Sequence, residues 1–329
     1  MKMDAIICDN KNKWDEFLME NSDIFLQAFE WGELQRGSGI KVLRLAVESD
    51  GNVLAQAQVT KESSSSKNYF YIPYGPIFKS GINEQQKKDA LDSLFKKIQE
   101  LAIKENCVFL RVEPVSSLSS GSGYNARPSL RRIQPRKTLV LDLTKTEEEL
   151  FKGLSRTTRY NIGLARRHGV KIKEQASYSH GFYELLEKTR NRQEFGIYPE
   201  SHYERIFKIN GEHIKSELFL AEYGGKIINS TIVLFFNNTA TTLHAGSDYD
   251  YRKIKGSNVL EWEIILSAKR KGFKKLDLWG IDEKRWPSLT DFKKGFGGSQ
   301  VEYPVGFDII FQRFWYSIYK IIKTIKGAR

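Results

Sequence analysis

The same order of predicted elements occurs twice in this chain of 329 residues. Residues 45–59 and 220–233 are runs of largely apolar residues, each broken by a glycine-containing turn, at Asp50-Gly51 and at Gly224-Gly225. Such runs predict β-hairpins. Each hairpin is followed by an aromatic segment, a helical stretch and a short apolar stretch that predicts a buried strand. The repeat predicts two domains of similar fold in tandem.

The two copies match the plan of a known fold. The predicted helices cover residues 84–106 and 257–273, and the predicted buried strands cover residues 107–114 and 274–281. A hairpin, a third strand, a helix and a fourth strand, preceded by a helical segment, form the plan of a GNAT-type acyltransferase domain. We therefore predict an α/β fold with mixed sheets, built from two tandem GNAT-like domains. A Ser- and Gly-rich segment, residues 116–129, precedes the boundary, which we place near Lys137.

Cysteine content and the distribution of apolar residues indicate the cellular compartment of the protein. The two cysteines, Cys8 and Cys107, make no disulfide framework, and the N-terminal residues lack the apolar core of a signal peptide. No apolar run approaches the roughly 20 residues that cross a bilayer as a helix. These features predict a protein of the reducing cytoplasm.

Several chemistries lack their sequence signatures. The five histidines show no paired metal-ligand spacing and the cysteines do not cluster, so we expect no metal site. A P-loop, a dinucleotide-binding glycine fingerprint and a serine nucleophile elbow are missing from the sequence. The glycine-rich R-x-x-G-x-G turn that would hold the pyrophosphate of coenzyme A is missing too. We therefore expect no cofactor, and an acyl donor other than acyl-CoA.

Positive charge is concentrated at the start of the second predicted domain. The formal net charge of the chain is +12, and residues 131–175 hold twelve Lys and Arg against five Asp and Glu. Residues 149–172 are interpreted as one helix with a basic stripe formed by Lys152, Arg156, Arg159, Arg166 and Arg167, and no acidic residue occurs between Glu149 and Glu174. Arg159, Arg166 and Arg167 are the predicted phosphate contacts. A solvated helix usually mixes charge signs, because like charges one turn apart repel by ~0.2 to 0.5 kcal/mol per pair. We interpret the stripe as a contact to phosphate or RNA backbone, with a solvated surface as the alternative.

Several segments together resemble the Fem family of peptidoglycan bridge aminoacyltransferases. They follow the family's order along most of the chain and comprise residues 25–35, 70–78, 109–114, 141–172, 244–253, 276–281 and 291–308. The resemblance implies transfer of an amino acid from aminoacyl-tRNA to the stem peptide of a UDP-linked or lipid-linked peptidoglycan precursor. It also implies that the C-terminal segment returns to the first domain. The domains are then residues 1–137 with 301–329, and residues 138–300, without the long helical arm that some members insert.

The motif FKKGFGG, residues 292–298, provides the best catalytic candidate under this resemblance. Transfer from an ester needs a fixed cation, which lowers the pKa of the attacking amine by repulsion and stabilises the oxyanion that forms. We predict that Lys293 is that cation, that Phe292 and Phe296 anchor the loop presenting it, and that Phe292 contacts substrate. We expect Lys294 to be surface charge. Without the resemblance, both lysines would be interpreted as surface charge beside a packed aromatic side chain.

Contacts to the precursor are implied residue by residue. Enzymes of the shorter FemX type, which this chain resembles, bind the precursor's diphosphate with a lysine after the Trp of the first motif. They also use an arginine before the proline of a G-I-x-P loop. This chain has Gln35 and Arg36 at the first place and Tyr198 at the second. A lipid-linked precursor held differently would explain both changes.

Other candidates come from strand ends and from the family's substrate positions. Glu113 ends a buried strand, and ligand-binding clefts of open α/β sheets form at strand ends, so it is a candidate substrate contact. A carboxylate at a strand end is equally often part of a turn or of an ion pair. The resemblance adds Tyr203, His244 and Asp248 as substrate contacts and Arg252 as a phosphate contact.

The C-terminal stretch is amphipathic at helical period, and no acidic residue follows Asp308. The apolar side chains predicted to share one face are Phe311, Phe314, Trp315, Ile318, Ile322 and Ile325. An apolar face with cationic flanks suits peripheral contact with an anionic membrane, at its cytoplasmic face. Packing of that face onto the first domain is the alternative.

Two other functions remain open from the sequence. The first is a GNAT-like N-acyltransferase that acts on another amine, with a different acyl donor. The second is a non-catalytic RNA-binding module, which the basic segment alone would satisfy.

Overall fold

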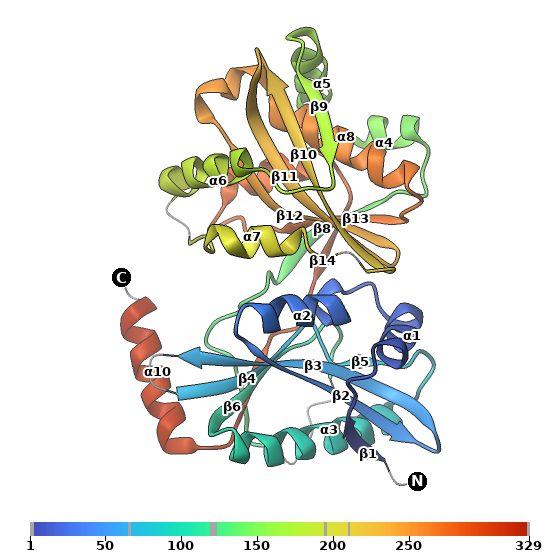
Figure 1. Cartoon of the computed structure of the whole chain (residues 1–329), viewed down its shortest axis with the longest axis vertical. Coiled ribbons are helices and arrows are strands. Elements are labelled where there is room, and N and C mark those ends of the chain that lie inside the picture. The colour runs from blue at the N-terminus through green and yellow to red at the C-terminus, as the bar shows by residue number, and fades with distance from the viewer. Residues whose placement is uncertain (1–2, 65–66, 119–123, 194–195, 210, 328–329) are drawn as a thin grey trace. The chain divides into compact units, whose positions relative to one another are not determined.

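The chain folds into two compact units, and the computed structural model describes residues 3–64, 67–118, 124–193, 196–209 and 211–327 (Figure 1). Unit 1 comprises Met1–Arg136 together with Tyr303–Arg329, and unit 2 comprises Lys137–Glu302. Each unit has one β-sheet with helices packed against it.

The sheet of unit 1 has the strand order β1-β2-β3-β4-β6-β15-β7, with β5 paired to β3. Its strands are β1 (Asp4–Ile7), β2 (Lys41–Ser49), β3 (Asn52–Ser64), β4 (Lys67–Pro73), β5 (Ile77–Phe78), β6 (Cys107–Glu113), β7 (Ala126–Pro128) and β15 (Phe307–Ile310). The helices are α1 (Lys11–Asn21), η1 (Phe25–Gln27), α2 (Phe29–Gly37), α3 (Glu84–Lys104) and α10 (Arg313–Gly327). The core of this unit lies between α3 and the sheet.

The sheet of unit 2 has the order β14-β8-β13-β12-β11-β10-β9. Its strands are β8 (Lys137–Asp142), β9 (Lys171–Gln175), β10 (Ile214–Tyr223), β11 (Lys226–Phe236), β12 (Thr239–Ser247), β13 (Lys275–Gly280) and β14 (Ser299–Glu302). The helices are α4 (Glu147–Gly153), α5 (Arg156–Arg167), α6 (His180–Gln193), α7 (Glu200–Ile206), η2 (Tyr249–Ile254), α8 (Gly256–Arg270) and α9 (Pro287–Lys294). Figure 1 shows α6 and α7 on the face of the sheet opposite to α8.

The repeat predicted from the sequence is confirmed. The hairpins are β2–β3 and β10–β11, and each leads into a further antiparallel strand, β4 or β12. A helix, α3 or α8, then crosses over to a strand that pairs in parallel, β6 or β13. The fold is therefore mixed α/β with two sheets, as expected. Among the described residues of unit 2, the longest helix is α8 with 15 residues, so no long helical arm occurs there.

The basic segment forms two helices, so the prediction of one continuous helical stripe is wrong. Helix α4 ends at Gly153, and Leu154 is extended with φ −69° and ψ 148°. A new helix, α5, begins after Ser155, whose side chain caps it by accepting a hydrogen bond from the Thr158 backbone N–H. Lys152 and Arg159 therefore lie on different helices.

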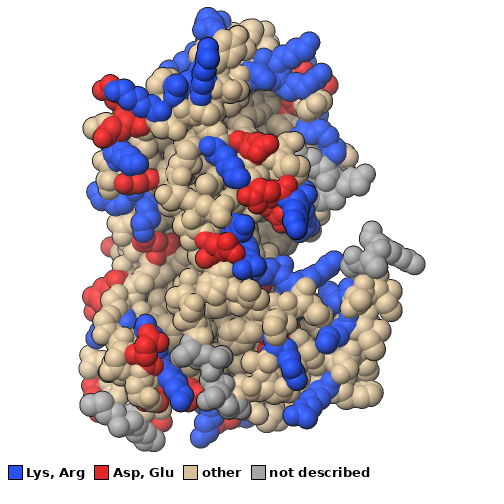
Figure 2. All heavy atoms as spheres, turned by 180° about the vertical axis from the view of Figure 1, so that it is seen from behind, with Lys and Arg blue, Asp and Glu red and all other residues tan. Residues whose placement is uncertain are grey.

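The C-terminal segment is part of unit 1. Strand β15 is antiparallel to both β6 and β7, and the buried Arg111 guanidinium donates two hydrogen bonds of 2.8 Å to the carboxylate of Asp308 on β15. Helix α10 then packs Tyr316 and Tyr319 against Tyr69 and Phe109. The predicted apolar face is partly wrong, because two of its members, Phe314 and Ile325, are exposed while the tyrosines carry the packing. Figure 2 shows Lys and Arg side chains on the surface of unit 1 where α10 lies, along the right-hand edge of that view.

Candidate active site

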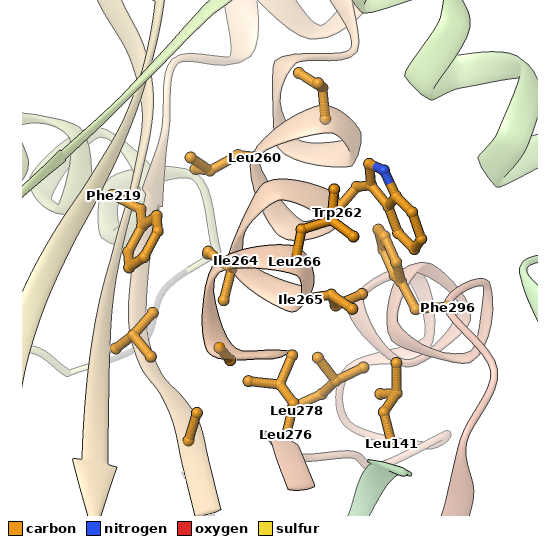
Figure 3. Close-up of a cluster of buried hydrophobic side chains, with 14 of the residues drawn as sticks. Leu141, Phe219, Leu260, Trp262, Ile264, Ile265, Leu266, Leu276, Leu278 and Phe296 are labelled. Atoms are coloured by element: carbon orange, nitrogen blue, oxygen red, sulfur yellow. The ribbon is translucent and has the colours of Figure 1, made fainter. Parts of the chain in front are cut away.

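Lys293 lies in the last turn of α9 and not in a loop, which corrects the prediction for this segment. The residue is half-buried, and its ammonium donates a hydrogen bond of 2.7 Å to the Gly280 carbonyl oxygen at the end of β13. The flanking aromatic rings, Phe292 and Phe296, meet edge to face with centroids 5.2 Å apart. Phe296 is buried in the core of unit 2 together with Trp262 of α8 (Figure 3). The two aromatics therefore fix the turn that carries the lysine.

Two glycines after the lysine allow the chain to pack closely on unit 2 itself. A Cβ atom on Gly295 would lie 2.4 Å from the Thr158 hydroxyl oxygen of α5. A Cβ atom on Gly298 would lie 2.8 Å from the Val140 carbonyl oxygen, and Gly298 has φ +86°, which disfavours other residues. The segment that follows α9 therefore packs closely against α5 and β8.

Two buried carboxylates act electrostatically on Lys293. Asp277 of β13 accepts hydrogen bonds from the Thr138 hydroxyl and, at 2.7 Å, from the Trp279 backbone N–H. Glu261 of α8 is buried, and its Oε1 atom has no hydrogen-bond partner among the described residues. An unpaired buried carboxylate oxygen is costly unless it is protonated or faces a cation or a ligand.

The burial of these groups changes their pKa values. Burial lowers the pKa of Lys293 to about 8, although Glu261 and Asp277 act in the opposite direction. Burial raises the pKa of Glu261 to about 7, partly offset by the charge of Lys293, and also raises the pKa of Asp277. A lysine and a glutamate whose pKa values approach each other near neutrality are typical of functional sites.

The arrangement supplies one well-oriented cation. An ammonium group has three N–H donors, and within the described chain only the Gly280 carbonyl accepts from Lys293. Two donors therefore remain for an oxygen on which negative charge develops. Lys294, by contrast, points outward and pairs with Glu283 at 3.0 Å, both side chains being exposed.

A second cluster joins α7 to β12 and holds three of the predicted substrate residues. The exposed Tyr198 ring stacks on His202 with centroids 4.2 Å apart, and its backbone N–H donates to the Tyr203 hydroxyl at 3.2 Å. The buried Tyr203 ring meets His244 edge to face at 5.1 Å. Burial raises the pKa of Tyr203 to about 12 and lowers the pKa of His202 to about 4 and of His244 to about 3. At neutral pH the cluster is therefore uncharged, which suits the packing of an uncharged part of a substrate.

The remaining predicted residues of unit 2 have local partners. Asp248 caps η2 and pairs with Lys188 at 2.6 Å, and the Lys188 ammonium lowers the pKa of the Asp248 carboxyl. The Arg252 guanidinium lies over the ring of Tyr249, 4.4 Å from its centroid.

The three arginines predicted to contact phosphate differ in their surroundings. Arg159 donates to the carbonyl oxygens of Lys152 and Leu154 and so closes the end of α4. Arg166 is exposed and pairs with Glu263 of α8 at 2.9 Å, an acidic neighbour that the sequence pattern did not show. Arg167 is also exposed, with its guanidinium 5.9 Å from the ring centroid of Tyr160.

Arg36 and Glu113, two predicted residues of unit 1, also have protein partners. Arg36 at the end of α2 pairs with Asp9 and Glu33, both at 3.1 Å, and Gln35 beside it is half-buried. Glu113 is fully buried and accepts hydrogen bonds from the Tyr71 hydroxyl at 2.7 Å and from the backbone N–H groups of Ile133 and Gln134. These contacts fit the turn-holding alternative for Glu113.

Glu261, Asp277 and His202 were not predicted from the sequence. Glu261 and Asp277 are carboxylates inside apolar runs, NVLEWEIIL and KLDLWG, and a charged residue in a buried element is the signal that could have identified them. His202 carries no such signal. Within the described ranges, no group of three or more His, Cys, Asp or Glu side chains could hold a metal ion.

Comparison with known proteins identifies relatives along most of the chain. The sequence model of the FemAB family matches residues 10–128, 122–225 and 217–324. The chain is 24% identical over 304 residues to the lipid II:glycine glycyltransferase of Staphylococcus aureus, and the match covers 87% of this chain and 67% of that protein.

Solved structures show the same fold at low sequence identity. A crystal structure of FemX matches 97% of this chain and 99% of its own, with a TM-score of 0.78 and 19% identity. A tandem GNAT protein from the clavulanic acid biosynthesis pathway matches 94% of this chain and 98% of its own, with a TM-score of 0.58 and 13% identity.

Proposed function

Since this chain belongs to the FemAB family, we propose that it is an aminoacyltransferase of peptidoglycan bridge formation. It transfers an amino acid from aminoacyl-tRNA to an amine on the stem peptide of a peptidoglycan precursor. The similarity to a lipid II:glycine glycyltransferase favours a lipid-linked precursor over a UDP-linked one. The two units then serve as the family's two GNAT-like domains, the first completed by the C-terminal segment.

The observation that carries this proposal is the oriented ammonium of Lys293. The amine nitrogen attacks the carbonyl carbon of the aminoacyl ester, a C–N bond forms, and the carbonyl oxygen becomes an oxyanion. The oxyanion then collapses, the bond to the ribose oxygen breaks, and the proton lost by the amine goes to that oxygen. Lys293 donates hydrogen bonds to the oxyanion, and its charge lowers the pKa of the attacking amine by repulsion.

Glu261 is expected to set the pH range in which Lys293 is charged. Because the pKa of Lys293 is about 8, activity should fall as the pH rises through that value. Ionised Glu261 raises the lysine pKa, so Glu261→Gln should lower that pKa and shift the alkaline limb of the kcat profile downward by ~1 pH unit. The measurement is kcat against pH, with KM followed separately.

Glu283→Gln is the matched control, since Glu283 is exposed and pairs with Lys294 and not with Lys293. Its alkaline limb should coincide with that of the unmodified protein. An unshifted limb in Glu261→Gln would remove Glu261 from the control of the lysine charge.

We infer that Arg166 and Arg167 contact tRNA phosphate, since both are exposed at the end of α5. Replacing both by Gln should reduce the slope of log affinity for tRNA against log salt by between one and two. The control is Lys215→Gln with Lys226→Gln, two exposed lysines of β10 and β11, which should leave the slope unchanged. Arg159 is left out of the test because its loss would also uncap α4. An equal slope in the arginine variant and the control would assign the two arginines to the solvated surface.

The donor decides between this function and its alternatives. The protein is incubated with an amine-bearing precursor and either charged tRNA or acyl-CoA, and the mass of the precursor is followed. We expect a mass gain of one or more amino acid residues with charged tRNA only. Acylation from acyl-CoA would favour an N-acyltransferase of another kind, and tRNA binding without any transfer would favour an RNA-binding module.

A further inference from the structure

Helix α10 has two faces, and only one of them packs on unit 1. Tyr316 and Tyr319 are buried against the aromatic cluster of β4 and β6. Phe314, Ile321 and Ile325 are 70%, 60% and 61% exposed. Their spacing of seven and four residues places them on one side of the helix, and we call these three residues the outer stripe. Three large apolar side chains exposed in a row are unusual for a helix that is already packed on its other side.

Cations flank the outer stripe. Arg313 and Lys320 lie on α10 itself, and neither forms an ion pair with another described residue. Lys67, at the start of β4, lies over the Trp315 ring with its Nζ atom 3.9 Å from the centroid. The sequence has no Asp or Glu after Asp308, which is itself buried with Arg111. In Figure 2 the edge of unit 1 at α10 shows blue cations and tan atoms.

We propose that the outer stripe and its flanking cations dock α10 on an anionic lipid surface. The helix would lie in the plane of the interface, with the outer stripe in the acyl boundary and the ammonium and guanidinium groups among the lipid headgroups. Its 15 residues are about 22 Å long at ~1.5 Å per residue. In the described part of the chain, no helix is both long and apolar enough to cross a bilayer. A helix of this length is too short to cross the bilayer, so we expect α10 to lie on its surface.

The charge distribution favours a lipid surface over other occupants. A second copy of the chain packing on the same face would bring the cations of two α10 helices together, which is unfavourable. A nucleic acid would meet the cations but would leave the outer stripe in water. An anionic bilayer satisfies both groups at once. Docking does not require the proposed function, but if the acceptor is lipid-linked, docking would bring the enzyme to the surface that holds it.

Vesicle co-sedimentation tests the proposal without substrate. The full chain is mixed with vesicles of phosphatidylglycerol and phosphatidylcholine, or of phosphatidylcholine alone. We expect binding to the anionic vesicles that weakens as salt is raised, and little binding to the neutral ones. Arg313→Gln with Lys320→Gln should weaken binding about 25-fold at low salt, since each cation near such a surface contributes about fivefold. Phe314→Ser, Ile321→Ser and Ile325→Ser together should weaken binding at least ~10-fold.

Matched controls show whether exposed lysines or apolar side chains elsewhere on the surface affect vesicle binding in the same way. The charge control is the double variant Lys96→Gln with Lys104→Gln, which replaces two exposed lysines of α3. The apolar control is Ile103→Ser, at a side chain of α3 that is 74% exposed. Both controls should bind vesicles like the unmodified protein. Circular dichroism and thermal melting should show folded variants, because every replaced α10 side chain is exposed. If a triple variant melts early, the single variant Ile321→Ser replaces it, with an expected loss of several-fold.

Two results would overturn the proposal: no binding to anionic vesicles, or equal losses of vesicle binding in the α10 variants and the α3 controls.

Transfer to a water-soluble, lipid-free precursor analogue is measured in parallel. An α10 variant that loses vesicle binding should keep this transfer. Absence of transfer in the unmodified protein would count against the proposed function and leave the docking result unaffected.

Discussion

Lys293→Met is expected to lower the turnover number about 10²- to 10³-fold, the usual cost of removing one donor to an oxyanion. Methionine is close to lysine in length and keeps the contacts of the stem, but it cannot donate to the carbonyl oxygen of the ester. The buried Asp277 and Glu261 lose their cation, and they adapt by taking up protons, because burial already raises the pKa of both groups. Single-turnover transfer from charged tRNA measures the effect, and precursor binding should be retained.

Lys294→Met is the control one residue away. Its ion pair with Glu283 is exposed, and such pairs contribute at most ~1 kcal/mol. We expect turnover within about twofold of the unmodified protein, which corresponds to less than ~0.5 kcal/mol. Similar and mild losses from both substitutions would show that the catalytic group lies elsewhere in the chain.

Asp308→Ala is expected to destabilise unit 1 by about 3–5 kcal/mol, because it leaves the Arg111 guanidinium buried without its carboxylate. Both side chains are almost fully buried, with 2% and 0% of their surface exposed. The pair joins β6 to β15, so its loss also loosens the attachment of the C-terminal segment. Hydrogen exchange of the amides in β6 and β15 measures the change, with β11 and β12 of unit 2 as the internal reference.

Two further variants identify the cause. Arg111→Leu combined with Asp308→Ala removes the uncompensated charge and should recover much of the lost stability. Glu100→Ala, which breaks the partly exposed pair between Lys97 and Glu100, should cost less than ~1 kcal/mol. If Asp308→Ala alone is as stable as the unmodified protein, the Arg111–Asp308 pair is not a buried structural link.

The elements that could be predicted are those with a strong local signal. The hairpins have glycine turns between apolar strands, and α3 and α8 have long helical patterns, so the repeat of hairpin, strand, helix and strand was visible in the sequence. The break between α4 and α5 also had a signal, Ser155 as an N-cap, but the surrounding helical period outweighed it.

The environment of Lys293 could not be predicted in the same way. The motif indicated an anchored lysine, and the anchoring of Phe296 in the core fits that expectation. The partners that set its charge come from α8 and β13, and its hydrogen-bond acceptor is a backbone carbonyl of Gly280, which no side-chain pattern reveals. Likewise, the outer stripe of α10 is visible only once Tyr316 and Tyr319 are known to be buried.

In the proposed reaction, an aminoacyl group passes from tRNA to a peptidoglycan precursor at Lys293. The most direct measurement uses tRNA charged with an isotopically labelled amino acid and follows the label into the precursor by mass spectrometry. We predict a labelled product whose added mass equals whole amino acid residues, which disappears when the tRNA is digested first, and which forms far more slowly with Lys293→Met. An unlabelled precursor after incubation with the folded protein and a full set of charged tRNAs would show that the protein does not catalyse this transfer.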